Sequence, residues 1–563
     1  MKDQDGHLIV NSQDKAEVLN NFFSSVFIAD DGVCPGFEPR VNNSSFSHIS
    51  FTPNIVFDTL RCLRATTSTG PDGIPNILLK KLCGQLALPL SHIFTISFNS
   101  QQVPDDWKHA HVKPLFKNGV ASDPNNYRPI SLTSTCCRVM ERIINKELID
   151  YLLDKSLVSK EQHGFIRRRS TCSNLLECLQ DWMLSIDNKR ITDVIYIDFK
   201  KAFDQVSHNK LLLKLNSYGI TGDLYGWIKS FLSNRTQAVK LDGCLSSVIA
   251  ILSGVPQGSV LGPILFVLFI NDLVDCFKNL AVSTKLFADD LKLYTSYGLT
   301  DSSCDLTEAL HRVTVWAKKW QLTINSTKCN VLRIVNPRCK NKSDIVYDLN
   351  GSSLKVLSVV KDLGVAVDKN LRFDNHISSV VHKSLQRANL ILKCFQSRDR
   401  SLLMKAFKVY VRPLLEYATP VWSPHFMYLI LKIEHVQRSF TKRLFGLKNL
   451  TYIDRLKQLE IDTLERRRLI YDLCTCFKII HGYNDTCLDM NRMHLEGRPN
   501  NTRGHNLKLA KEMCRTDMLR FFFCNRICTV WNSLPLDVVN APSVNSFKKR
   551  VSKFNLDRFL TLK

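Results

Sequence analysis

Two adjacent aspartates inside an apolar run constrain the fold more than any other feature of the chain. The stretch KLFADDLKLY, residues 285–294, places Asp289 and Asp290 between two strand-like arms, a pattern that predicts a hairpin. Two carboxylates about 4 Å apart repel by roughly 4 kcal/mol at an effective dielectric of 20. A shared proton or a divalent cation relieves that repulsion, and oxygen donors favour Mg²⁺. The alternative is a solvated hairpin tip, which is the commoner role of such a pair.

A third carboxylate ends another apolar stretch. Asp198 lies at the end of TDVIYIDF, residues 192–199, which has the pattern of a buried strand. If this strand and the hairpin are neighbours, three carboxylates come together. Such a set can hold two metal ions about 3.5–4 Å apart, which stabilise the attacking and leaving oxygens of a phosphoryl displacement. A strand cap is the plainer interpretation of Asp198.

The charge of the chain points to a polyanionic partner. The 563 residues are enough for several cores, and the net charge is +24 with a pI near 9.3. Residues 381–563 hold 33 Lys and Arg against 15 Asp and Glu, so this part carries most of the positive charge. The alternative is a solvated basic surface without a partner.

The sequence has neither a secretory or membrane-spanning pattern nor a disulfide or zinc framework. The 19 cysteines lack the spacing of a disulfide or zinc framework and predict reduced thiols. The stretch MKDQDGHLIV is polar, and VLGPILFVLFI, residues 260–270, is too short to span a bilayer. We therefore expect no membrane segment and no secretion.

Helical and strand-like patterns are unevenly distributed. Residues 59–100 predict two helices around the turn STGPDGIP, and HAHVKPLFK, residues 109–117, predicts a strand. QAVKLDGCLSSVIAI predicts a hairpin at Asp242–Gly243. From 376 to 480 the pattern is almost entirely helical and basic. The predicted class is α+β, with a helical, basic appendage.

The motifs between and around the acidic segments resemble those of one enzyme family. YIDFKKAFDQVSH, SGVPQGSVLGPILF and FADD follow one another as in reverse transcriptases, and the pattern is most similar to non-LTR (LINE-type, jockey-like) retrotransposons. GPDGIP, NNYRPISLTSTCCRVMERII, QHGFIRRRST, LTINSTKCN and KDLGVAVDKNLRFDNHI extend the resemblance on both sides. FADD has Ala where many retroviral-type enzymes have Met, a departure that favours the non-LTR group.

The resemblance implies a right-hand polymerase. It assigns fingers and a palm with an antiparallel sheet to 50–375, a helical thumb to 376–480, and a basic C-terminal segment to 481–563. Residues 1–49 are then a connector remnant. An apurinic-type endonuclease usually precedes this polymerase and has no counterpart here, which implies a truncated gene copy or a truncated gene prediction. The arginines and aromatics of 481–563 predict RNA binding by stacking, with a packed core and a basic exterior as the alternative.

The resemblance also implies roles for individual residues. Asp198, Asp289 and Asp290 would hold two Mg²⁺ ions, with Mn²⁺ as a substitute. Lys328 in NSTKCN would protonate the leaving pyrophosphate, with a plain surface lysine as the alternative. Lys117 and Arg128 would hold the triphosphate, because both cations suit phosphate contacts.

Another group of residues is implied in selecting the incoming nucleotide. Phe203 would lie beneath the sugar and exclude a 2′-OH, although a core phenylalanine fits its apolar context equally well. Gln257 and Gly258, in the loop GVPQG, would contact the nascent base pair, with a loop leading into a helix as the alternative. Lys201 and Asp204 are expected to be solvated neighbours.

These expectations add up to RNA-directed DNA polymerisation. The expected partners are an RNA template, a DNA primer or target, and dNTPs; the oligomeric state is left open. Chemistry on chromosomal DNA implies a nuclear location, or a cytoplasmic ribonucleoprotein. The alternatives are a decayed or domesticated RNA-binding remnant, and an RNA polymerase of similar shape, against which Phe203 argues.

Overall fold

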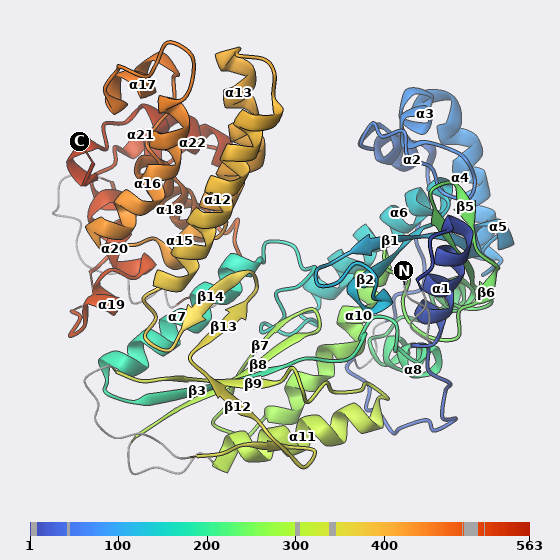
Figure 1. Cartoon of the computed structure of the whole chain (residues 1–563). Coiled ribbons are helices and arrows are strands. Elements are labelled where there is room, and N and C mark those ends of the chain that lie inside the picture. Colours follow the sequence, from blue (N-terminus) through green and yellow to red (C-terminus); the bar gives the residue numbers. More distant parts are fainter. Residues whose placement is uncertain are drawn as a thin grey trace.

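The computed structural model describes residues 1, 8–41, 45–298, 304–336, 345–486, 488, 505–511 and 513–562. A sheet occupies the lower centre of the molecule in Figure 1, with the N-terminal helices on one side above it and the C-terminal helices on the other. The sheet formed by the middle of the chain therefore lies between the N-terminal and the C-terminal helices. Among the described residues, no helix combines the length and the apolar character needed to cross a membrane.

The central sheet is mixed and contains the predicted acidic hairpin. Its strand order is β12-β9-β3-β8-β7, and only the β12–β9 pairing is parallel. The strands are β3 (Ile191–Ile197), β7 (Ser283–Phe287), β8 (Asp290–Tyr297), β9 (Asn330–Ile334) and β12 (Lys355–Leu357). The alternation of side chains sends Val194 into one core and Ile195 into the other, because both faces of β3 are covered. This explains the continuous apolar run before Asp198.

Two helices cover opposite faces of this sheet (Figure 1). Helix α7 (Thr171–Asp187) contacts β3 and β7, whereas α11 (Cys304–Lys319) contacts β8. Short elements surround the sheet: η2 (Asn271–Phe277), β10 (Asp348–Leu349), β11 (Ser352–Ser353), β13 (Val359–Asp362) and β14 (Val365–Asp368).

A second sheet lies among the N-terminal helices. Its path is β2-β1-β4-β5, with β6 also paired to β4. The strands are β1 (His109–Phe116), β2 (Tyr127–Leu132), β4 (Thr236–Leu241), β5 (Cys244–Leu245) and β6 (Ile249–Ala250). The predicted turn at Asp242–Gly243 joins β4 to β5, where Leu241 pairs with Cys244.

The helices of this region include one from the expected connector. They are α1 (Ser12–Ser24), α2 (Pro53–Arg61), α3 (Asn76–Lys81), α4 (Cys83–Asn99), α5 (Asp105–Lys108), η1 (Pro124–Asn126), α6 (Thr135–Asp154), α8 (His208–Ser217), α9 (Gly222–Leu232) and α10 (Gly262–Ile270). Ala16, Leu19 and Phe23 of α1 bury against Val112 and Val239 of the second sheet. Helix α1 of the expected connector is thus packed against the second sheet.

The C-terminal part is helical, as the periodicity of 376–480 predicts. Its elements are α12 (Asp374–Cys394), α13 (Arg400–Ala406), the π-helix η3 (Phe407–Val411), α14 (Arg412–Glu416), α15 (Thr419–Trp422), α16 (Met427–Lys442), α17 (Tyr452–Gln458), α18 (Leu464–Ile480), α19 (Asp517–Arg520), α20 (Phe523–Asn532), α21 (Leu536–Val539), α22 (Val544–Lys553) and η4 (Asp557–Phe559). One core joins α7 to these helices.

The described part of 481–563 contributes buried side chains to the C-terminal core. Phe522, Phe523 and Trp531 are buried, whereas Phe521 is partly exposed and stacks on His425 with ring centroids 4.2 Å apart. Buried rings cannot stack on bases, so the alternative interpretation of this segment, a packed core, describes these three aromatics.

Candidate active site

The acidic pair lies at a two-residue turn. Phe287 pairs with Asp290 across the β7–β8 hairpin, and Ala288 and Asp289 form the turn between them. Ala288 adopts a left-handed φ of 57°. This conformation costs an L-residue with a side chain about 1–2 kcal/mol, and it is the kind of turn that matches the twist of a hairpin. The predicted hairpin is confirmed, with a strained alanine at its tip.

The third carboxylate lies at the same end of the sheet. The antiparallel register of β3 and β8 ends with Ile197 opposite Leu291. Asp198, the next residue after Ile197, therefore lies beside Asp290, the first residue of β8. Desolvation and then Asp198 raise the pKa of Asp289. Desolvation, followed by repulsion from Asp289, Asp362 and Asp198, raises the pKa of Asp290 to about 6, although this side chain remains accessible to solvent. The three carboxylates therefore interact electrostatically.

Asp198 is oriented by the loop before β9. Asn325 Nδ2 donates to Asp198 Oδ2 at 3.0 Å, and the backbone N–H of Asn325 donates to the carbonyl of Asp198 at 2.7 Å. The Lys328 ammonium lies 3.7 Å from Asp198 Oδ2, with its side chain 63% exposed. Lys328 thus lies beside Asp198, on a loop that the same aspartate holds.

The three aspartates supply oxygen donors of the kind that a divalent cation prefers. Their chemistry fits a hard divalent cation, because three carboxylates repel one another at one sheet edge. In the part of the chain that the structure describes, however, no group of three or more His, Cys, Asp or Glu side chains is arranged to hold a metal ion. The metal-binding role of the three aspartates accordingly stays a prediction.

Two further cations face the acidic end. Arg128 on β2 pairs with Leu115 of β1, and Lys117 follows β1 directly. Both side chains are exposed. Desolvation, Arg128 and Lys328 lower the pKa of Lys117, whereas Asp198 and Asp289 act in the opposite direction. The predicted triphosphate ligands and the predicted acidic set therefore share one electrostatic environment.

The GVPQG loop packs against the segment after β3. Val255 N–H donates to the carbonyl of Phe203 at 2.8 Å, and the Phe203 ring stacks on Phe266 with centroids 4.2 Å apart. Gly258 has φ +124°, and a Cβ there would lie 2.4 Å from the carbonyl oxygen of Ser131. Glycine is required here by both conformation and space. Phe203 is half-buried, so its ring is a core contact that keeps one accessible side.

The expectation that Asp204 is solvated is wrong. Asp204 is only 7% exposed, and Gln257 Nε2 donates to its Oδ1 at 2.9 Å. Desolvation raises the pKa of Asp204 to about 6. The apolar neighbours of Asp204 in AFDQV are the sequence signal for this burial. Lys201 is half-buried as well, with its ammonium 5.2 Å from the centre of the Phe22 ring.

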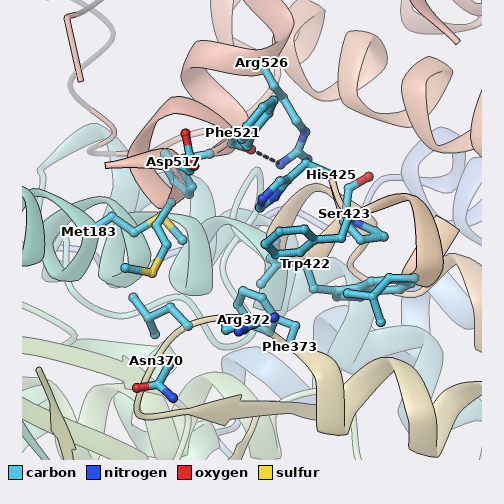
Figure 2. A pocket seen from close by; sticks show the side chains of 17 residues that line it. Met183, Asn370, Arg372, Phe373, Trp422, Ser423, His425, Asp517, Phe521 and Arg526 are labelled. Carbon is cyan, nitrogen blue, oxygen red and sulfur yellow. Dashed lines mark hydrogen bonds between the residues drawn. The ribbon is translucent and has the colours of Figure 1, made fainter. Parts of the chain in front are cut away.

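A separate cavity of about 170 Å³ lies in the C-terminal part (Figure 2). It is lined by Met183 of α7, by Arg372, and by His425, Phe521 and Arg526. The sequence-predicted site residues are absent from its lining. Its cations already have partners, since Arg526 binds Asp472 and Arg372 binds Asp374. The cavity is therefore distinct from the acidic hairpin.

Comparison with known proteins adds the family. Residues 115–366 match the family described as reverse transcriptase (RNA-dependent DNA polymerase). The chain is 29% identical over 386 residues to the probable RNA-directed DNA polymerase from transposon BS of Drosophila melanogaster, which covers 65% of this chain and 42% of the relative. It is 30% identical over 396 residues to the RNA-directed DNA polymerase from mobile element jockey of Drosophila funebris, covering 68% and 43%.

A longer match is found with the jockey polymerase of Drosophila melanogaster. It is 27% identical over 463 residues, which is 79% of this chain and 50% of the relative. The chain thus spans about half or less of the length of these relatives. All residues predicted for the site, from Lys117 to Lys328, fall inside the matched range 115–366. The chain therefore contains a reverse transcriptase domain at residues 115–366 and is a relative of the RNA-directed DNA polymerases of non-LTR retrotransposons.

Proposed function

We propose that this chain copies RNA into DNA by adding deoxynucleotides to a primer 3′-OH, as part of a non-LTR retrotransposon. One observation carries the proposal: within the reverse transcriptase domain, the register of β3 and β8 brings Asp198 to the acidic hairpin, with Lys117 and Lys328 close enough to act on the same charges.

Asp198, Asp289 and Asp290 are the residues that would hold two Mg²⁺ ions, or Mn²⁺ in their place. Bound divalent cations supply charge neutralisation for the phosphates and for the attacking and leaving oxygens. Asn325 holds the Asp198 carboxylate in place by a hydrogen bond. The left-handed turn at Ala288 sets the position of Asp289 and Asp290, which follow it directly. Catalysis would rest mainly on such positioning and electrostatics.

The cations supply the contacts for the nucleotide. Arg128 and Lys117 would bind the triphosphate, since both are exposed and the acidic set is their electrostatic neighbour. Lys328 would deliver a proton to the leaving pyrophosphate. Its exposed ammonium has the freedom to turn from Asp198 toward a phosphate oxygen.

Nucleotide selection would fall to the packed pair of loops after β3 and before α10. The accessible side of Phe203 would meet the sugar, and Gly258 would allow a close backbone approach. The Gln257 amide already donates to Asp204, so we assign Gln257 an indirect part in which it holds the loop and presents its backbone to the base pair.

The architecture suits a right-hand polymerase. The central sheet would be the palm, the β1–β2 region with its helices the fingers, and the helices of 376–480 a thumb that contacts the duplex (Figure 1). A positive C-terminal third favours binding to the phosphates of an RNA template and a DNA primer or target. Action on chromosomal DNA would place the protein in the nucleus or in a cytoplasmic ribonucleoprotein.

Primer extension on an RNA template tests the proposal. Wild-type protein with Mg²⁺ and dNTPs should extend the primer, and Asp289→Asn should abolish extension while leaving the fold intact. Asp242→Asn is the control, because Asp242 also lies at a hairpin tip but in the second sheet, where it is exposed, whereas Asp289 is half-buried. A folded wild type that binds RNA and extends no primer would refute the polymerase and support the RNA-binding alternative.

A further inference from the structure

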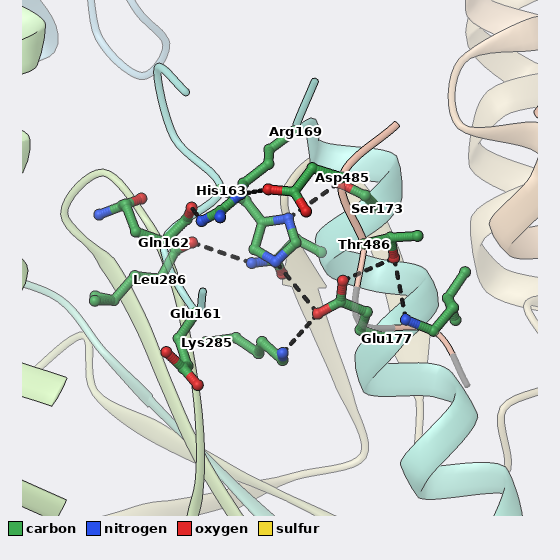
Figure 3. Close-up of polar contacts among 12 residues, drawn as sticks. Glu161, Gln162, His163, Arg169, Ser173, Glu177, Lys285, Leu286, Asp485 and Thr486 are labelled. Carbon is green, nitrogen blue, oxygen red and sulfur yellow. Dashed lines mark hydrogen bonds and ion pairs between the residues drawn. The ribbon is translucent and has the colours of Figure 1, made fainter. Parts of the chain in front are cut away.

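A loop upstream of the acidic hairpin is joined to β7 by a single parallel bridge between Gln162 and Leu286. Residues 161–163 run parallel to β7, because the Leu286 N–H donates to the Glu161 carbonyl at 2.9 Å and the His163 N–H donates to the Leu286 carbonyl at 2.9 Å. Figure 3 shows this loop beside Lys285 and Leu286 of β7. The QHGF motif, which no role in the proposed reaction uses, therefore lies directly against the acidic hairpin.

The side chain of Gln162 clamps the strained residue of the turn. Gln162 Oε1 accepts from the Ala288 N–H at 2.9 Å and from the Gly164 N–H at 2.8 Å. Its Nε2 points back to the Ala288 carbonyl at 3.4 Å. Gln162 is fully buried, so water does not replace these bonds. A left-handed alanine persists only where its surroundings impose that conformation, and Gln162 supplies such a constraint.

Gly164 lets the loop come close enough for this clamp. A Cβ at Gly164 would lie 2.3 Å from the Ala288 nitrogen and 3.0 Å from the Phe287 carbonyl carbon. Both atoms are backbone and cannot move aside without moving the turn. The spacing of Gln162 and Gly164 in QHGF is thus explained by contact with the turn that carries Asp289.

A buried ionic network holds the loop to α7 and β7 (Figure 3). His163 Nδ1 lies 3.0 Å from Ser173 Oγ, and its Nε2 lies 3.3 Å from Glu177 Oε2. The same Glu177 oxygen accepts from Lys285 Nζ at 2.6 Å. Burial opposes ionisation of Glu177, but His163 and Lys285 outweigh it and lower its pKa to about 2. Glu177 is therefore ionised at neutral pH and paired with Lys285, whereas burial lowers the pKa of His163, so its imidazole is neutral there.

The C-terminal segment closes this network from more than 300 residues away. Arg169 Nη1 donates to the carbonyls of Ser159 and Gln162 at 2.6 and 2.8 Å, and its Nε donates to Asp485 Oδ2 at 2.7 Å. Thr486 Oγ1 donates to Glu177 Oε1 at 2.8 Å. Asp485 thus orients the guanidinium that holds the carbonyl of Gln162, and Thr486 binds the carboxylate that holds His163.

We propose that Gln162 is a positioning residue that holds the turn carrying Asp289 and Asp290, and that Asp485 and Thr486 secure this clamp from the C-terminal segment. The catalytic part of this inference rests on the proposed function. Its structural part does not, because the clamp acts on the Ala288 peptide whether or not the protein polymerises. The C-terminal segment is then required for an ordered acidic hairpin, in addition to any contact with nucleic acid.

Hydrogen–deuterium exchange on the full chain separates the two parts. Gln162→Ala should speed exchange in the hairpin peptide around 286–292, while peptides of the distant helices α16 and α18 exchange as in the wild type. Gln437→Ala is the matched control, since it removes another buried amide, one that bonds Tyr452 and the Asp462 carbonyl in the C-terminal helices. Unchanged exchange at the hairpin in Gln162→Ala would overturn the clamp even if the wild type shows no polymerase activity.

Kinetics then test the positioning role. Gln162→Ala should lower kcat by about 100-fold, the loss expected when a reacting group is misplaced by about 1 Å, with little change in the KM for dNTP. Ala288→Gly should restore part of kcat in the Gln162→Ala background, because glycine adopts the turn without support. A loss of kcat that Ala288→Gly leaves unchanged, with normal hairpin exchange, would refute positioning through the turn.

The contact between Arg169 and Asp485, which we call the latch, is tested by a variant of its own. Asp485→Ala should raise hairpin exchange and lower kcat by about tenfold, less than Gln162→Ala, because Arg169 keeps its two backbone contacts. Glu308→Ala is the control, as Glu308 is an exposed carboxylate paired with Arg312 on α11. Equal behaviour of Asp485→Ala and Glu308→Ala in both measurements would remove the C-terminal segment from the inference.

Discussion

The side-chain amide of Gln257 donates to Asp204 at 2.9 Å and so joins the loop before α10 to the segment after β3. The other carboxylate oxygen of Asp204, Oδ2, is buried and has no hydrogen bond among the described residues. This pairing explains why an aspartate tolerates a nearly complete loss of solvent. It also makes Asp204 a sensitive point for the pH dependence of stability.

We expect Asp204→Asn to stabilise the protein at neutral pH. The pKa of Asp204 is raised from 3.8 to about 6, so the folded state binds more protons than the unfolded state between these values, and stability falls as pH rises through that window. Asparagine keeps the acceptor for Gln257 and removes the buried charge. The gain should reach at most about 3 kcal/mol at pH 7 and vanish near pH 4. Urea unfolding at both pH values measures it, and a destabilised variant at pH 7 would contradict the assignment.

Asp290→Asn should raise the melting temperature of the metal-free protein at pH 7.5. The pKa of Asp290 is raised to about 6 by desolvation and by the neighbouring carboxylates, so its ionisation above that pH weakens the fold. The difference from wild type should become small below about pH 4, because the Asp290 carboxyl is then protonated in the folded state and largely protonated in the unfolded state. Added Mg²⁺ and dNTP should raise the melting temperature of the wild type and leave that of Asp290→Asn unchanged. A variant that melts lower than wild type without metal would refute the repulsion.

Arg128→Ala should raise the KM for dNTP about 10–100-fold, since a hydrogen bond to a charged group contributes about 1.5–3 kcal/mol. Arg128→Lys should recover only part of the loss, because lysine lacks the bidentate geometry. Lys113→Ala is the control, because Lys113 is an exposed cation on the same β1–β2 pair. Steady-state extension at several dNTP concentrations measures the effect. Equal KM values for Arg128→Ala and Lys113→Ala would remove Arg128 from the triphosphate site.

Phe203→Val should weaken discrimination against ribonucleotides. The smaller side chain opens the space that the aromatic ring fills beside Phe266, so a 2′-OH meets less obstruction. The ratio of kcat/KM for dNTP to that for NTP should fall by at least tenfold. Phe266→Leu serves as the control, since it disturbs the same stack from the buried side. A similar change of ratio in both variants would assign the effect to packing.

Gly258→Ala should unfold the loop before α10. The added Cβ would lie 2.4 Å from the Ser131 carbonyl oxygen at a φ of +124°, so both strain and collision oppose it. Gly243→Ala is the matched control: its φ is +88°, with nothing within 4 Å of the added atom. We expect a cost of about 1 kcal/mol for the control and at least about 2 kcal/mol more for Gly258→Ala. Denaturant unfolding compares them, and equal costs would contradict the close approach.

Local pattern was sufficient for part of this description. The apolar run ending in Asp198, the hairpin around Asp289 and the turn at Asp242–Gly243 are encoded by neighbouring residues, because strand periodicity and turn chemistry act over a few positions. The order of the motifs was likewise sufficient to identify the reverse transcriptase resemblance, which the comparisons confirm. The individual catalytic roles remain predictions.

The tertiary structure decided what depends on long-range contact. Only the β3–β8 register places Asp198 beside Asp290, and only the packing of the loop before α10 buries Asp204. The clamp from Gln162 to Ala288 spans 126 residues, and the latch from Arg169 to Asp485 spans 316. No local periodicity encodes such pairs, because the two partners are brought together only by long-range folding of the chain. By itself the sequence determined which functional groups the chain contains and in which motifs they stand. Strand register and burial in the folded chain decided which of these groups lie together.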